Sequence, residues 1–343
     1  MTSFLKYDRS RAVAIWLMAV ALLVVAMVMV GGATRLTGSG LSITEWKPVK
    51  GVIPPLNLAE WQAEFARYRQ IPQYRLLNHG MSLGQFQSIY WWEWSHRLLG
   101  RALGVVFFLP AVWFVARREV SRRMGWRLAL LFVLGGLQGL VGWWMVASGL
   151  EGRVYVAPER LMTHLGLAFA LLGALVWTAL DAWAGWARQT LPSPWGARAL
   201  WLAGLIYLQV LLGALVAGNH AGLVYNDFPL FNGRLLPDDY FGHSLWGTLA
   251  HSQGAVQLHH RLMAVVVLVG SWAMADFARR STYLAPESKR LAVALGLAVT
   301  AQAFLGVATL MLAAPFALSM IHQLTAAVVF SLAVAVAWRV RRI

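Results

Sequence analysis

Eight long apolar segments divide this chain of 343 residues, and each is long enough to cross a lipid bilayer as a helix. We predict these helices at residues 12–33, 92–116, 128–147, 161–180, 199–217, 257–275, 291–312 and 316–339. Because 59% of the residues are hydrophobic and only 13% are charged, we expect an all-α integral membrane protein. The first segment is too long for a signal peptide and lacks a clear cleavage site, so we expect it to remain as a transmembrane helix.

Basic residues gather between the apolar segments. The chain has 29 Lys and Arg, and more than half of them fall at residues 6–11, 117–127, 188–198, 279–290 and 339–342. Clusters of this kind beside membrane spans stay on the cytoplasmic side, so we interpret the net charge of +15 as topology and not as a nucleic-acid surface. Both termini are then cytoplasmic. A short N-terminus without a Ser/Arg-rich presequence favours a bacterial inner membrane.

Two connections are unusually long. Residues 43–89 and 218–256 separate the predicted spans on the external side, and the first of them mixes prolines, tryptophans and charges of both signs. Long loops of this kind tend to cover functional sites. We expect the first loop to carry short surface helices.

The chain contains no cysteine. Disulfides, thiolate metal sites, iron–sulfur clusters and cysteine nucleophiles are therefore excluded. A bound metal would need His, Met or carboxylate ligands.

An internal repeat organises the chain into halves. Residues 95–98 (SHRL) match 259–262 (HHRL), residues 138–142 (QGLVG) match 302–306 (QAFLG), and residues 163–165 (THL) match 321–323 (IHQ). The matches occur in the same order at nearly one offset, which indicates a duplicated four-helix unit. We predict two tandem four-helix bundles, residues 1–190 and 191–343, related by a pseudo-two-fold axis along the membrane normal.

The repeat selects four of the nine histidines: His96, His164, His260 and His322. Each stands at the start of an even-numbered predicted helix, so all four are expected at similar depth near the external side. Two histidines from two helices of one bundle can ligate a haem iron from both faces. We predict one such haem site in each half, with a proton relay or a dinuclear metal site as the alternative.

Charged residues accompany these ligands. Arg97, Arg101 and Arg261 are candidates to bind haem propionates, because a guanidinium fork suits a carboxylate; the alternative is that they reach the membrane interface. Glu93 lies three residues before His96, on the same helix face. Its counterpart in the second half is Gln257, and this difference favours a catalytic carboxylate at the first site only. The alternative for Glu93 is an ion pair with Arg97.

Several stretches resemble one known family. They are GGATRLTGSGLSITEWKPVKGVIPPL from Gly31, YWWEWSHRLLGR from Tyr90, QGLVGWWMVASGL from Gln138 and YNDFPLFNG from Tyr225. Together they resemble haem A synthase, of the branch shared by mitochondria and proteobacteria, and the resemblance covers nearly the whole chain. The Gram-positive members carry cysteine pairs in the external loops, and this chain departs from them in having none.

The resemblance implies oxidation of the C8 methyl of haem O to a formyl group, through successive hydroxylations and loss of water, to give haem A for cytochrome oxidase. It implies that His96 and His164 hold the substrate haem and that Glu93 is needed for turnover. It also implies that His260 and His322 hold a haem b that passes electrons. Haem O synthase and cytochrome oxidase assembly factors are the partners it suggests, beside membrane lipid.

Two other functions fit the residues. A non-enzymatic membrane cytochrome b would hold two equivalent haems and would modify neither of them. A haem transporter or chaperone would move haem without oxidising it.

Overall fold

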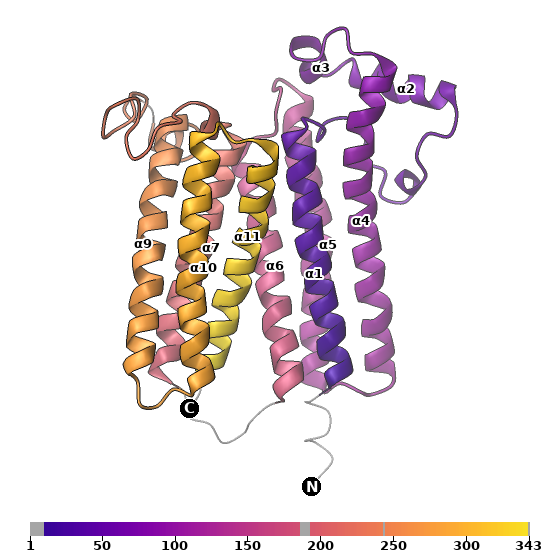
Figure 1. The fold of residues 1–343 in the computed structure, drawn as a ribbon. Helices are drawn as coiled ribbons and strands as arrows, with labels where there is room; N and C mark the ends of the chain where they lie inside the picture. The colour runs from indigo at the N-terminus through magenta and orange to yellow at the C-terminus, as the bar shows by residue number, and fades with distance from the viewer. Residues whose placement is uncertain (1–9, 186–192, 243, 342–343) are drawn as a thin grey trace.

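The computed structural model describes residues 10–185, 193–242 and 244–341, and it contains eight helices that are long and apolar enough to span a membrane (Figure 1). They are α1 (Arg11–Leu36), α4 (Leu83–Ala116), α5 (Arg122–Leu150), α6 (Pro158–Ala184), α7 (Pro194–Gly218), α9 (Gln253–Arg280), α10 (Pro286–Met311) and α11 (Phe316–Val340). The described residues form no β-strand. The prediction of an all-α, eight-helix membrane protein is confirmed. Lys6, Arg9, Arg188 and Arg342, which contribute to the predicted charge bias, lie outside the described residues.

Seven of the eight membrane helices begin earlier than predicted, and α4 and α5 do so by the most. Helix α4 starts at Leu83, nine residues before the expected position, because Ser82 and Gln85 form a reciprocal capping box there. Helix α5 starts at Arg122, where the Ser121 hydroxyl accepts a hydrogen bond from the backbone N–H of Met124. The basic stretch after α4 is therefore split between a turn and the first turns of α5. Hydropathy alone misses such polar helix ends.

The eight helices form a central group and two outer pairs. Helices α1, α6, α7 and α11 pack against one another at the centre, and the two halves meet where α6 contacts α7 and α11 and where α1 contacts α11. The outer pairs are α4 with α5, and α9 with α10. One continuous apolar core runs through the bundle, with Leu17, Phe169, Leu172, Leu295 and Phe330 among its buried side chains. Burial of large apolar side chains against their neighbours fixes how these helices sit.

A buried carboxylate joins the halves at the end where α1 begins and α11 ends. Asp181 of α6 is 1% exposed and accepts hydrogen bonds from Arg127 Nη1 at 2.6 Å, Arg341 Nη2 at 2.5 Å and Trp338 Nε1 at 2.9 Å. These donors come from α5 and from the end of α11. A charge in this position is stable only because it is paired and hydrogen-bonded.

The long loops lie at the opposite end of the bundle, above α4 and α9 (Figure 1). The first loop carries η1 (Lys50–Val52), α2 (Leu58–Tyr68) and α3 (Pro72–Leu76), so the short surface helices expected there are present. Trp61, Phe65 and Tyr68 of α2 pack with Phe86 and Tyr90, which lie on the part of α4 that extends beyond the predicted helix start. The second loop carries η2 (Ala221–Leu223) and α8 (Leu245–Ala250).

The halves also touch near the loops. Arg35, in the last turn of α1, donates to the backbone oxygen of Ala217 on α7. His220 follows α7, and its ring packs against Tyr155 with centroids 4.2 Å apart. Burial, followed by the charge of Arg35, lowers the pKa of His220.

Candidate functional site

The four predicted ligands occur on α4, α6, α9 and α11, one in each even-numbered span. His164, His260 and His322 lie six or seven residues after the starts of their helices. His96 lies thirteen residues into α4, because that helix extends further toward the loops. Three ligands are thus near a helix start as predicted, whereas His96 lies well inside its helix.

Each of these imidazoles rests on a glycine of the preceding span. A methyl group added at the glycine would lie about 3 Å from Cε1 of the ring: 2.9 Å for Gly31 and His96, 3.0 Å for Gly142 and His164, 3.1 Å for Gly213 and His260, and 2.9 Å for Gly306 and His322. No larger residue fits there unless the ring moves. The same contact, made four times, holds each ring in a defined place between two helices.

The ring nitrogens are available for ligation. The Nδ1 atoms of all four histidines are buried and have no hydrogen-bond partner among the described residues. The only hydrogen bond described for these side chains joins His260 Nε2 to Gln209 Nε2 at 3.3 Å. Leaving a buried nitrogen unpaired costs about 1–3 kcal/mol, so this arrangement favours a bound group that engages the rings. The donor set therefore fits a group that takes imidazole nitrogens.

The histidines are arranged as pairs. His96 and His164 are close enough to interact electrostatically, and so are His260 and His322. The described residues contain no group of three or more His, Asp or Glu side chains that could hold a metal ion. Two ligands without a third suit axial ligation of an iron porphyrin better than a protein-built metal site. Among the metal sites considered from the sequence, the bis-histidine haem arrangement is the one these contacts fit.

Three glutamines fix the backbones of three ligand helices. Gln138 donates to the backbone oxygen of His164 at 3.1 Å, Gln209 to that of His260 at 3.1 Å, and Gln302 to that of His322 at 2.9 Å. Each glutamine lies four residues before the glycine under the same imidazole. The motif Gln-x-x-x-Gly was visible in the sequence at residues 138–142 and 302–306, but only as a marker of the repeat.

The exception is helix α1. Met27 lies four residues before Gly31, where the other three helices have glutamine. Its Cε would be 3.3 Å from a methyl group at Gly100 of α4, so the side chain fills space and donates no hydrogen bond. His96 is therefore the one candidate ligand whose backbone lacks a glutamine latch.

Glu93 is engaged on both oxygens. It is 3% exposed, and Arg97 Nη2 donates to Oε1 at 2.6 Å. The Ser42 hydroxyl and the Ile43 backbone N–H both donate to Oε2 at 2.8 Å. The ion pair with Arg97, stated as the alternative for Glu93, is present, and it attaches the first loop to α4. A catalytic role for Glu93 stays a prediction.

The second half builds the same attachment without a carboxylate. Gln257 is 2% exposed; it accepts from Arg261 Nη2 at 2.5 Å and donates to the backbone oxygen of Ala221 at 2.8 Å. Arg261 also donates to the loop carbonyls of Asp227 and Leu230, both at 2.9 Å. The glutamate-to-glutamine difference therefore has a structural reason as well, since only the first loop presents an N–H and a hydroxyl to this position.

The predicted propionate partners mostly bind loop carbonyls. Arg97 donates to the backbone oxygens of Ile43 and Glu45, and Arg101 donates to those of Lys47 and Pro48. Two nitrogens of these three arginines are buried and without a described hydrogen-bond partner, Nη1 of Arg101 and Nε of Arg261, one in each half. Propionate binding stays a prediction for all three arginines, and these two nitrogens are the donors that could serve it.

Comparison with known proteins identifies the family of this chain. Residues 14–334 match the family model described as cytochrome oxidase assembly protein. The chain is 59% identical to "Heme A synthase" from Caulobacter sp. (strain K31), and 57% identical to that of Caulobacter vibrioides, over the full length of both chains in each case. It is 51% identical to "Heme A synthase" from Parvibaculum lavamentivorans, with 97% of this chain and 94% of the relative covered. The chain belongs to the cytochrome oxidase assembly protein family that this model describes.

Proposed function

We propose that this protein is a haem A synthase, an oxidoreductase of the membrane that converts the C8 methyl of haem O to a formyl group. The observation that carries the proposal is the set of four imidazoles, each seated on a glycine and each with an unpartnered buried nitrogen. The relatives named "Heme A synthase" that match over the whole chain support the same activity. We also propose that the protein lies in a bacterial inner membrane, with both termini on the cytoplasmic side.

Within this proposal, His96 and His164 hold the substrate haem O, and His260 and His322 hold a resident haem b. The resident haem would supply electron transfer to and from the substrate site. The chain's own residues place the ligand rings through the glycine contacts and attach the external loops through Arg97 and Arg261. The loops then cover the ends of the ligand helices and keep water from the reacting methyl.

Open space along α5 supports the assignment of the substrate to the first half. Gly135 lies seven residues before Gly142, so it faces within about 20° of the same direction on the helix. It continues the stripe of buried Leu128 and Leu131, yet it is exposed, and a methyl group there would meet nothing within 4 Å. The same holds for the space beside Gly139.

The second half fills the matching position. At the repeat offset, Leu128, Leu131 and Gly135 correspond to Ala292, Leu295 and Val299, and all three of the latter are buried. Haem O carries a long isoprenoid tail where haem b carries a vinyl group. The open space beside Gly135, about 10 Å along the helix from Gly142, has room for such a tail in the first half. In the second half, the side chain of Val299 fills the corresponding space.

The activity is tested by chromatography of haems extracted from cells that co-express this chain with a source of haem O. Haem A in the extract supports the proposal. Unmodified haem b alone, held by two equivalent sites, would indicate an electron-transfer cytochrome. Haem O that changes location but not structure would indicate a transporter.

The assignment of the two sites is tested with substitutions that exchange the space between the halves. Gly135→Val is expected to lower the haem O and haem A retained on the purified protein while the b-type spectrum persists. His322→Ala should remove that spectrum, and Val299→Gly should leave it in place. A b-type spectrum that survives His322→Ala would refute the second site, even if the activity stands.

A further inference from the structure

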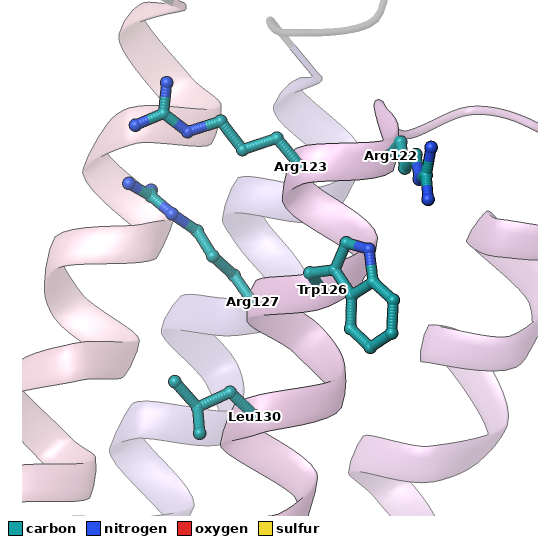
Figure 2. Close-up of a pocket in the computed structure, with 5 residues that line it drawn as sticks. All are labelled: Arg122, Arg123, Trp126, Arg127 and Leu130. Atoms are coloured by element: carbon teal, nitrogen blue, oxygen red, sulfur yellow. The ribbon is translucent and has the colours of Figure 1, made fainter.

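Exposed tryptophans mark where the bilayer surfaces meet the helices of the first half. Trp92 and Trp113 of α4 are both exposed and lie 21 residues apart, about 31 Å along the helix. Trp126 and Trp144 of α5 are also exposed and lie about 27 Å apart. Figure 2 shows Trp126 beside the arginines at the start of α5. Both separations match the roughly 30 Å of a hydrocarbon core, whose boundaries tryptophans favour.

The first loop contacts α4 between these boundaries. Arg101 lies nine residues from Trp92 toward the other end of the helix, a distance of about 13 Å. Its Nη2 donates to the backbone oxygen of Lys47 at 2.9 Å, and its Nε donates to that of Pro48 at 2.8 Å. An extended arginine side chain and one hydrogen bond together reach about 10 Å, so both carbonyls lie on the hydrocarbon side of Trp92. Figure 1 shows this stretch of the loop beside α4, below α2 and α3.

The backbone of this stretch is suited to such a depth, because N–H and C=O groups in hydrocarbon need partners within the protein. Arg101 supplies donors to two carbonyls. Three hydrogen bonds close the turn at η1, from the N–H groups of Gly51, Val52 and Ile53 to the carbonyls of Lys47, Val49 and Lys50. The three prolines of the stretch, Pro48, Pro54 and Pro55, have no N–H to satisfy.

The side chains that this stretch turns away from the protein are apolar. Val49 is 79% exposed, Ile53 is 65% exposed and Leu56 is 76% exposed. Residues 46–59 contain no carboxylate, and the long side chain of Lys50 can reach the headgroups from this level. An exposed apolar set of this kind marks an interaction surface. At the depth that Arg101 sets, the material facing it is the acyl chains of the bilayer.

The second half lacks this contact. At the repeat offset, Arg101 corresponds to Val265, which is exposed on α9. The carbonyls of the second loop bind Arg261 instead, which corresponds to Arg97 and lies one turn nearer the loops. Valine is an ordinary lipid-facing residue at this depth, whereas an arginine there requires polar partners. The carbonyls of Lys47 and Pro48 are those partners.

We propose that residues 49–56 are embedded in the membrane leaflet on the loop side, with Val49, Ile53 and Leu56 among the acyl chains and Arg101 holding the segment against α4. The partner is the hydrocarbon of the lipid, without selection for a headgroup. The same loop donates to Glu93 through Ile43, so the bilayer provides a further attachment for it. The inference does not depend on the proposed activity.

The absence of cysteine makes a direct test possible, because one introduced cysteine carries one spin label. Full-length Val49→Cys and Ile53→Cys variants are labelled and reconstituted into vesicles of phosphatidylcholine and phosphatidylglycerol. Power saturation of the electron paramagnetic resonance signal then compares access by oxygen, which concentrates in hydrocarbon, with access by a water-soluble nickel chelate. The oxygen-to-nickel ratio should equal that of lipid-facing Val265→Cys and exceed that of Leu76→Cys, which is exposed in α3 of the same loop.

A second variant tests the role of Arg101. Arg101→Gln, combined with Ile53→Cys, should lower the ratio toward the value at position 76. Arg75→Gln removes an exposed arginine from α3 and is the matched control, with an unchanged ratio expected.

Two results would overturn the proposal. Equal ratios at positions 53 and 76 would place the segment in water, and exclusion of both reagents at position 53 would place it against a second copy of the chain. The comparison of labelled positions in the otherwise native protein decides between these outcomes even if Arg101→Gln fails to fold.

Discussion

Replacing Glu93 with glutamine separates the structural role of this carboxylate from a chemical one. In the native site, Oε2 accepts from both the Ile43 N–H and the Ser42 hydroxyl, each at 2.8 Å. A glutamine can still accept from Arg97 through its carbonyl oxygen, as Gln257 does from Arg261 at 2.5 Å. Its NH₂ group, however, would then face the Ile43 N–H, and two donors cannot satisfy each other.

The expected cost follows from that mismatch. One buried backbone N–H loses its acceptor, which destabilises the attachment of the first loop by about 1–3 kcal/mol. Local opening of residues near Ile43 should therefore become roughly 5- to 150-fold more frequent, since 1.4 kcal/mol corresponds to a factor of ten. The helices beneath, which are held by the apolar core, should keep their protection.

Hydrogen–deuterium exchange followed by mass spectrometry measures this local opening on peptides that cover the first loop. Peptides from α1 and α6 serve as internal references. Gln257→Glu is the matched control in the other half. In the native protein, Gln257 Nε2 donates to the backbone oxygen of Ala221 at 2.8 Å. A glutamate there would place a carboxylate oxygen against that carbonyl oxygen, so faster exchange should be seen in the second loop instead of the first. If Glu93→Gln abolishes haem A formation while exchange near Ile43 and haem retention both stay native, the positional account is refuted and a chemical role is supported.

Three further predictions follow from single contacts. Gly306→Ala should weaken retention of the haem b proposed at His260 and His322 by roughly 5- to 150-fold in spectral titrations, because overpacking of about 1–3 kcal/mol displaces the His322 ring; Gly204→Ala, which meets open space, should change nothing. Asp181→Asn should lower the free energy of unfolding by about 3 kcal/mol in thermal denaturation, and a loss under 1 kcal/mol would contradict its role in joining the halves. The pKa of His220 is lower in the folded protein than in the unfolded chain, so the unfolded chain takes up the proton first and stability falls as the pH drops below about 6.5. Melting temperatures between pH 8 and pH 5.5 should decline less steeply in His220→Asn than in the native protein.

The sequence predicted the membrane helices well because hydropathy is a strong signal over twenty residues. The internal repeat picked out His96, His164, His260 and His322, and each of them makes the same kind of contact with a glycine. The helix ends were less predictable. Leu83 and Arg122 begin helices in polar sequence, where local caps decide the boundary and hydropathy carries no information.

Pairwise polar contacts were beyond prediction from one sequence. The pairing of Glu93 with Arg97 could be listed as an alternative, because four residues separate them on a helix. The bonds from Ser42 and Ile43 to the same carboxylate depend on how a loop 50 residues away folds back over α4. Similarly, Asp181 meets Arg341 only where α6 packs against α11, which follows 130 or more residues later in the chain.

Met27, which stands where the other three helices have glutamine, affects how long a haem would stay bound at His96. An enzyme must release its product after every cycle, whereas a resident cofactor stays through many cycles. The backbone oxygens of His164, His260 and His322 each accept a hydrogen bond from a glutamine amide, whereas the helix that carries His96 has the thioether of Met27 beside Gly100. Within the proposed substrate site, His96 is thus the ligand whose backbone oxygen accepts no glutamine amide, and Met27→Gln should slow release of the product more than its formation.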